Sequence, residues 1–174
     1  RMTIGKNARA ALKWVCYSLL LLLCFGLQSS PALLRIGDIK PVLIIPAAIS
    51  VALFENEAGS GGFGLAAGLL WDLSAGKLFG FYGMVLMICC VCVSLLSMYF
   101  VKVNVTNSLL MTAASGFICT LWNFVFYYLI WGYEGVGQCL LRLLLVLLYT
   151  VAATAPVYYL TRLISTRFNP VVRA

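Results

Sequence analysis

The sequence predicts an all-α fold: a polytopic membrane helical bundle of about six transmembrane helices, forming one integral membrane domain over residues 1–174. Hydrophobic residues make up 63% of the chain and charged residues only 10%, with a mean hydropathy of +1.03. Such a composition cannot be wrapped around one water-facing core. The apolar residues also come in several long blocks separated by short polar breaks, which is the pattern of a protein that crosses the bilayer repeatedly.

The first two spans are predicted over 14–34 and 39–54. Basic residues precede the first span, as in a signal peptide, but no A-x-A-like cleavage site follows it and further spans come after. We therefore expect a retained first helix. Pro41 stands near the start of the second span, where a proline suits the first turn of a helix because its missing N–H would be unpaired there anyway.

The third span is predicted over 61–73, after the glycine-rich stretch FENEAGSGG. We expect this stretch to turn the chain back, with Glu55 and Glu57 as solvated loop charges. At about 1.5 Å of rise per residue, the second and third spans are short for a hydrocarbon core of about 30 Å. One of them is therefore expected to be broken, re-entrant or packed wholly among neighbouring helices.

The remaining spans are predicted over 78–101, 109–131 and 139–164. The fourth is long enough to cross unaided, and the fifth ends in a cluster of aromatic residues typical of the membrane interface. The sixth contains Pro156 and runs into a basic tail. Six spans is the favoured number, and five is the alternative.

The orientation follows from the distribution of lysine and arginine, because positive flanks are retained in the cytoplasm. With the N-terminus inside, the cytoplasmic side holds Arg1, Lys6, Arg9, Lys13, Lys102, Arg162, Arg167 and Arg173, whereas the outer side holds Arg35, Lys40, Lys77 and Arg142. Both termini are therefore expected in the cytoplasm. Because these residues sit singly at the ends of apolar blocks, they indicate topology and not a surface for nucleic acid.

The inventory of reactive side chains argues against an enzyme. The chain has no histidine, so a Ser-His or Cys-His nucleophile pair is impossible. Cys89 and Cys92 have C-x-x-C spacing, but they lie in the apolar run LMICCVCVSLL, where thiols act as small hydrophobic side chains. We expect no catalytic residue, no metal and no cofactor.

Glycines recur at every fourth position around a single aspartate in the third span. Gly-x-x-x-Gly spacing allows two helix backbones to approach closely, and an ionisable group at membrane depth usually faces protein or water. Asp72 could cap the next helix or turn, or pair with Lys77; alternatively it could contact a partner subunit or a pocket. The predicted partner or packing residues are Gly64, Gly68, Asp72, Gly76 and Gly80.

The most distinctive part of the sequence runs from Pro41 to Gly83. It combines a proline at the start of the second span, an acidic turn with glycines, and a G-F…G-L-L-x-D pattern; the pattern residues are Gly62, Phe63, Gly68, Leu69, Leu70 and Asp72, followed by Gly80. The tail VLLYTVAATAPVYYLTRLISTRF places Pro156 before a basic end. In these features, and in length and span number, the chain resembles the rod shape-determining protein MreD family.

This resemblance implies a non-enzymatic component of the bacterial cell-elongation machinery. It implies that the chain binds an MreC-like protein and, through it, the RodA-type glycosyltransferase and its transpeptidase partner that build lateral peptidoglycan. It also implies a fold similar to the substrate-binding S components of energy-coupling-factor transporters.

An S component that takes up a vitamin is therefore the alternative function. S components typically dock through an A-x-x-x-A motif in the first span, but the pair with this spacing here, Ala48 and Ala52, lies in the second span. An uptake subunit would also need several convergent polar groups in its pocket, and the chain offers few besides Asp72, Asn123 and its tyrosines. Both points favour the scaffold.

Overall fold

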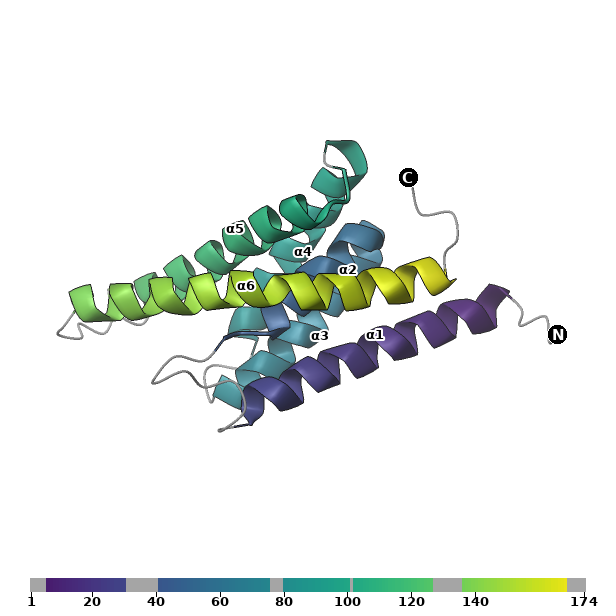
Figure 1. Cartoon of the computed structure of the whole chain (residues 1–174). Coiled ribbons are helices and arrows are strands. Elements are labelled where there is room, and N and C mark those ends of the chain that lie inside the picture. Colours follow the sequence, from purple (N-terminus) through teal and green to yellow (C-terminus); the bar gives the residue numbers. More distant parts are fainter. Residues whose placement is uncertain (1–5, 31–40, 76–79, 101, 127–135, 169–174) are drawn as a thin grey trace.

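The computed structural model describes residues 6–30, 41–75, 80–100, 102–126 and 136–168, and the regular elements within these ranges are all α-helices (Figure 1). The prediction of an all-α fold is therefore confirmed for the described residues. The helices are α1 (Lys6–Ser29), α2 (Ile44–Phe54), α3 (Glu57–Ala75), α4 (Phe81–Tyr99), α5 (Val105–Phe124) and α6 (Val136–Phe168).

Four stretches within the described residues are long and apolar enough to cross a membrane, which indicates a membrane protein. α2 is apolar but too short to be one of these four stretches, and the glycine-rich α3 is not one of them either. The four candidate spans are Ala8–Ser29, Phe81–Tyr99, Val105–Phe124 and Leu141–Phe168.

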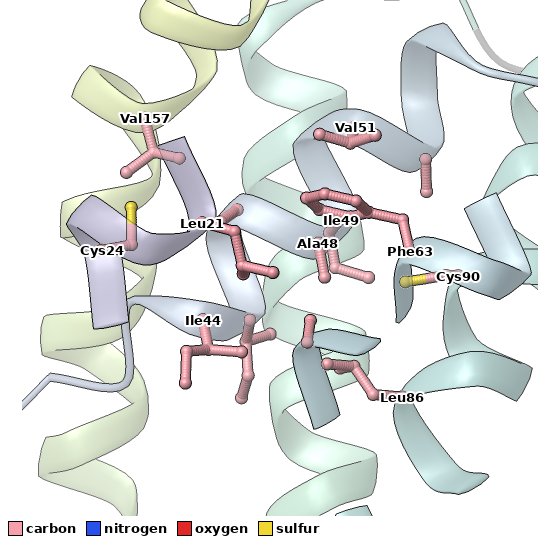
Figure 2. Close-up of a cluster of buried hydrophobic side chains, with 14 of the residues drawn as sticks. Leu21, Cys24, Ile44, Ala48, Ile49, Val51, Phe63, Leu86, Cys90 and Val157 are labelled. Carbon is pink, nitrogen blue, oxygen red and sulfur yellow. The ribbon is translucent and has the colours of Figure 1, made fainter. Parts of the chain in front are cut away.

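The short helix α2 forms the centre of the bundle. Its 11 residues extend about 16 Å, roughly half of the hydrocarbon thickness. Every residue from Ile44 to Leu53 is buried, and Figure 2 shows its side chains among others from α1, α3, α4 and α6. The second predicted span is thus the one that packs wholly among its neighbours.

The helix α3 is longer than predicted, and the expected glycine turn before it is wrong. α3 begins at Glu57, so only Glu55 and Asn56 separate it from α2. The glycines lie inside the helix, and at Gly59 and Gly61 neighbouring side chains occupy the space of the missing one, whereas a Cβ on Gly62 would meet nothing within 4 Å. A Cβ on Gly59 would lie 2.9 Å from the Trp14 ring. Glycine marks close helix contacts here, as it commonly does in membrane helices.

The bundle places hydroxyl groups inside and large apolar side chains outside. On α6, the hydroxyls of buried threonines donate hydrogen bonds to carbonyls one turn earlier in the same helix. Thr150 Oγ1 donates to the Val146 carbonyl at 2.7 Å, and Thr161 Oγ1 donates to the Val157 carbonyl at 2.9 Å. Exposed leucines cover the outer sides of α1 and α6. The apolar outer surface suits a bilayer, because lipid solvates it. Among the buried hydroxyls of the described residues, those of Ser50, Ser108, Thr112 and Ser165 have no hydrogen-bond partner.

One end of the bundle collects most of the described basic residues; we call it the basic end. Lys13 near the start of α1 contacts Glu55 at the end of α2, and Ser97 near the end of α4 donates to the Leu53 carbonyl. The start of α1 and the end of α6 lie on the same side of the molecule (Figure 1). The described basic residues at this end are Lys6, Arg9, Lys13, Lys102, Arg162 and Arg167, whereas Arg142 lies toward the other end.

Candidate functional site

The predicted glycine ridge lies against α4. A Cβ on Gly64 would lie 2.8 Å from Cys90 Sγ and 2.9 Å from the Leu86 carbonyl oxygen. A Cβ on Gly68 would lie 2.5 Å from Gly83 Cα. Because backbone atoms cannot move aside as a flexible side chain can, the two helices approach each other this closely only with glycine at these positions.

Asp72 continues this ridge and caps the start of α4. Its carboxylate accepts hydrogen bonds from the backbone N–H groups of Gly80 at 2.9 Å, Tyr82 at 3.0 Å and Gly83 at 3.3 Å. The first N–H groups of a helix have no intrahelical acceptor, and a negative charge is favourable there. With only 1% of the residue exposed, Asp72 has no surface left for a partner subunit.

Gly80 explains why the cap comes from another helix. It occupies the N-cap position of α4 with φ of +91°, a left-handed conformation that favours glycine. Glycine has no side chain to accept the N–H groups that follow, so Asp72 supplies the acceptor from α3. A Cβ on Gly80 would meet nothing within 4 Å, so this glycine serves backbone geometry and not packing. Gly76 lies outside the described residues.

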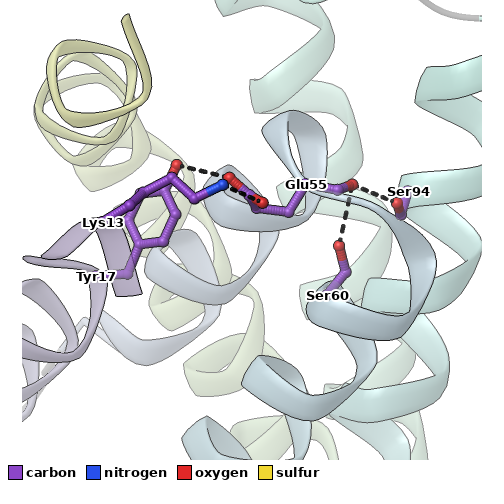
Figure 3. Close-up of polar contacts among 5 residues, drawn as sticks. All are labelled: Lys13, Tyr17, Glu55, Ser60 and Ser94. Atoms are coloured by element: carbon purple, nitrogen blue, oxygen red, sulfur yellow. Dashed lines mark hydrogen bonds and ion pairs between the residues drawn. The ribbon is translucent and has the colours of Figure 1, made fainter. Parts of the chain in front are cut away.

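A second buried acid, Glu55, holds α1 to the centre of the bundle (Figure 3). Lys13 Nζ lies 2.8 Å from Glu55 Oε2, and the Tyr17 hydroxyl donates to Oε1 at 3.1 Å. The Lys13 and Glu55 side chains are only 10% and 9% exposed. The prediction of Glu55 as a solvated loop charge is therefore wrong, because this residue directly follows the central helix α2 and its carboxylate is covered by α1.

The backbone of Glu55 also forms hydrogen bonds, to side chains of α3 and α4. Its carbonyl oxygen accepts hydrogen bonds from Ser94 Oγ on α4 at 2.7 Å and from Ser60 Oγ on α3 at 3.3 Å. Lys13 and Tyr17 are four residues apart, which places them on one helix face. That spacing, together with an acid at the end of a short apolar helix, is a sequence signal that could have indicated this cluster, which was not predicted from the sequence.

An apolar groove of about 520 Å³ separates α4 from α5; we call it the α4–α5 groove. Its lining residues recur every three or four positions on both helices, so it runs along them. Aromatic rings gather at one end, where the centroids of Phe81 and Phe126 are 5.0 Å apart. The lining comprises Phe81, Met84, Val85, Ile88, Cys89, Cys92, Val93 and Leu96 of α4, and Met111, Ala114, Ser115, Ile118, Trp122 and Phe126 of α5 and the residues after it.

Six cysteines in the described part of the chain are free thiols, and three of them belong to these packed surfaces. Cys89 and Cys92 line the α4–α5 groove, the first buried and the second exposed, and Cys90 contacts the glycine ridge. Within the described ranges, no three His, Cys, Asp or Glu side chains are grouped so as to hold a metal ion.

The chain matches no protein-family model, no curated protein and no solved structure. Three features of the structure bear on what the chain does. These are the closed α3–α4 contact, the buried Lys13–Glu55 pair and the open α4–α5 groove.

Proposed function

We propose that this chain is a non-enzymatic scaffold of the bacterial cell-elongation machinery, which binds an MreC-like protein in the cell membrane. Through that protein it supports a RodA-type glycosyltransferase and its transpeptidase partner in lateral peptidoglycan synthesis. The observation that carries the proposal is the laterally open α4–α5 groove. The sequence resemblance to the MreD family names the partner.

The groove has the position and length expected of a binding site for a membrane helix. Both of its walls are helices long and apolar enough to span a bilayer. The lining extends over residues 81–96 and 111–126, and the sixteen residues on each wall extend over about 22 Å. This length falls within a hydrocarbon core of about 30 Å, so a protein occupant at this depth would be an apolar membrane segment.

The lining residues also suit helix packing. Cys89, Ala114 and Ser115 are small, and small side chains let a second helix backbone come close in a membrane. Met84 and Met111 lie beside them, and unbranched methionine adapts its shape to a partner surface. The groove thus combines small residues, which let a second helix come close, with methionines that can adapt their shape to it.

The buried acids support a structural role over a catalytic one. Both carboxylate oxygens of Asp72 accept hydrogen bonds from backbone N–H groups. Both carboxylate oxygens of Glu55 are engaged by Lys13 and Tyr17. A general acid or base must reach a reacting proton, and these side chains are committed to contacts that hold helices together.

The charge distribution supports an orientation with both termini in the cytoplasm. In the full sequence, eight basic residues belong to the predicted cytoplasmic ends and four to the outer ends, and the structure describes six of the former and Arg142 of the latter. Because lysine and arginine near span ends are retained on the cytoplasmic side, the basic end is assigned to the cytoplasm and Asp72 to the outer half of the bundle.

Co-purification in mild detergent tests this proposal. The full chain is co-expressed with an MreC-like protein, and the complex is isolated through a tag on either protein. We expect both proteins in constant ratio after size exclusion. If the MreC-like protein is absent and mass spectrometry instead finds a vitamin bound to the chain, the scaffold proposal fails and the uptake subunit is supported.

A further inference from the structure

We propose that the outward sides of α1 and α6 at the basic end bind the phosphate headgroup of an anionic phospholipid. This site is separate from the α4–α5 groove and does not depend on the scaffold function. Its basic groups are the exposed side chains of Arg9 on α1 and of Arg162 and Arg167 on α6.

The two helices bring these arginines to the same end of the molecule. α1 and α6 pack against each other, and the start of α1 and the end of α6 lie on the same side (Figure 1). The inward positions of both helices are buried: Lys13 and Tyr17 on α1, and Thr161 and Ser165 on α6. The arginines occupy the remaining outward positions.

The chemistry of these three side chains suits a phosphate group. The described residues include two acids at this end, Glu55 and Glu57, and Glu55 is already paired with Lys13. None of the three arginines forms an ion pair within the described part of the chain. A guanidinium donates two parallel hydrogen bonds to a phosphate, which makes arginine better suited to this contact than lysine.

The depth of the arginines matches the headgroup region. α6 has 33 residues and is about 50 Å long, so it extends beyond a hydrocarbon core of about 30 Å. Leu160 and Leu163 beside Arg162 are 48% and 65% exposed, and Leu12 near Arg9 is 46% exposed. Charged heads therefore adjoin lipid-facing apolar side chains, as a phospholipid with an anionic head and apolar tails requires.

This combination selects a lipid over other anionic partners. The excess of basic over acidic side chains at this end attracts anions in general. A nucleic acid or an acidic soluble protein, however, would gain nothing from the exposed leucines next to the arginines. An anionic phospholipid contacts both kinds of side chain at once.

Native mass spectrometry of the full chain released from nanodiscs tests the site. The nanodiscs contain phosphatidylglycerol and phosphatidylcholine in equal amounts, and the ratio of the two lipids bound to the protein is measured. The triple variant Arg9→Gln, Arg162→Gln, Arg167→Gln should lower the preference for phosphatidylglycerol by roughly tenfold or more. Arg142→Gln at the other end matches the charge change of each single glutamine variant and should leave the preference unchanged.

Replacing the same three arginines with lysine separates charge from geometry, and we expect an intermediate preference for phosphatidylglycerol. The proposal is overturned if the triple glutamine variant keeps the wild-type preference, or if Arg142→Gln lowers it equally. Single glutamine variants, each at an exposed position, provide the same readout should the triple variant not fold. Retention of the MreC-like protein is measured in parallel, so failure of the lipid site is distinguished from failure of the scaffold function.

Discussion

The two sides of α4 show opposite ways of using a membrane helix. On the α3 side, Gly64 and Gly68 have no side chains, and the backbones of α3 and α4 lie so close that a Cβ at either glycine would clash. On the α5 side, large residues such as Met84, Ile88 and Trp122 remain 62%, 56% and 48% exposed, and a groove stays open. Because lipid solvates an apolar surface as well as a protein interior does, residue size and shape decide which side closes.

The closed side is also fixed by polar contacts at both ends. Asp72 binds the N–H groups at the start of α4, and the Glu55 carbonyl accepts a hydrogen bond from Ser94 toward its end. Between α4 and α5, ring contacts join Phe81 to Trp122 and Phe126, and the apolar groove runs between the two helices. The α3 side of α4 is therefore the more tightly packed of the two.

The largest effect is expected where Glu55 holds α1 and the closed side together. Lys13→Met leaves a buried carboxylate without its cation and should lower the free energy of unfolding by about 3–5 kcal/mol. Thermal unfolding in detergent, followed by circular dichroism, measures this loss. Lys102→Met, which removes an exposed lysine at the same end, is the control and should change little.

The double variant Lys13→Met, Glu55→Gln sharpens this prediction. Removing both charges eliminates the unpaired ion, so part of the lost stability should return. Equal stability of the single variant and the wild type would mean that the ion pair does not hold α1.

A smaller loss is expected from a methyl group in the closed contact. Gly68→Ala places a Cβ 2.5 Å from Gly83 Cα and 2.6 Å from the Tyr82 carbonyl oxygen, so α3 and α4 must separate, at about 2–3 kcal/mol. Gly62→Ala is the matched control on the same helix, because its Cβ meets nothing within 4 Å. It should be neutral or stabilising by roughly 0.5 kcal/mol, since alanine favours helix. Similar melting temperatures for the two variants would contradict the close contact.

The cap at the start of α4 should have an intermediate effect. Asp72→Asn keeps the shape of the side chain but replaces one accepting oxygen with a donor, and should cost about 1–2 kcal/mol. Hydrogen exchange at the amides of Gly80, Tyr82 and Gly83 should quicken in this variant. Glu57→Gln, at an exposed acid of the same helix, serves as the control. Unchanged exchange at those three amides would argue against the cap.

The smallest stability effect is expected on the open side. Ile118 is 49% exposed in the groove, so Ile118→Trp fills free space and should shift the free energy of unfolding by less than about 0.5 kcal/mol. The same variant should lose most of its bound MreC-like protein. Leu19→Trp, at an exposed position of α1, should retain it.

Much of the fold was predictable, because long apolar blocks with polar breaks report membrane helices directly. The four-residue spacing also identified which residues share a face, and Gly64, Gly68 and Asp72 do lie on one contact with α4. The turn before α3 was not predictable from its glycines, because the same residue serves a turn and a close helix contact. Only the packing partner distinguishes the two, as Trp14 does at Gly59.

The polar cluster around Glu55 and the α4–α5 groove were not predicted from the sequence and were found only in the structure. Glu55 looks like a loop charge in sequence, and its burial follows from where α2 lies within the bundle. The groove consists of ordinary apolar residues such as Ile88 and Ile118. Their number and spacing are the same whether a neighbouring helix covers them or not, so an open groove leaves no mark in the sequence.

Photo-crosslinking in native membranes tests the central claim, that the open side of α4 binds the partner. A photoreactive amino acid is placed at Ile88 in the groove or at Leu19 on the outer side of α1, both exposed apolar positions. We predict a crosslink to the MreC-like protein from Ile88 and none from Leu19. A partner that co-purifies but crosslinks only from Leu19, or from neither position, would contradict the account.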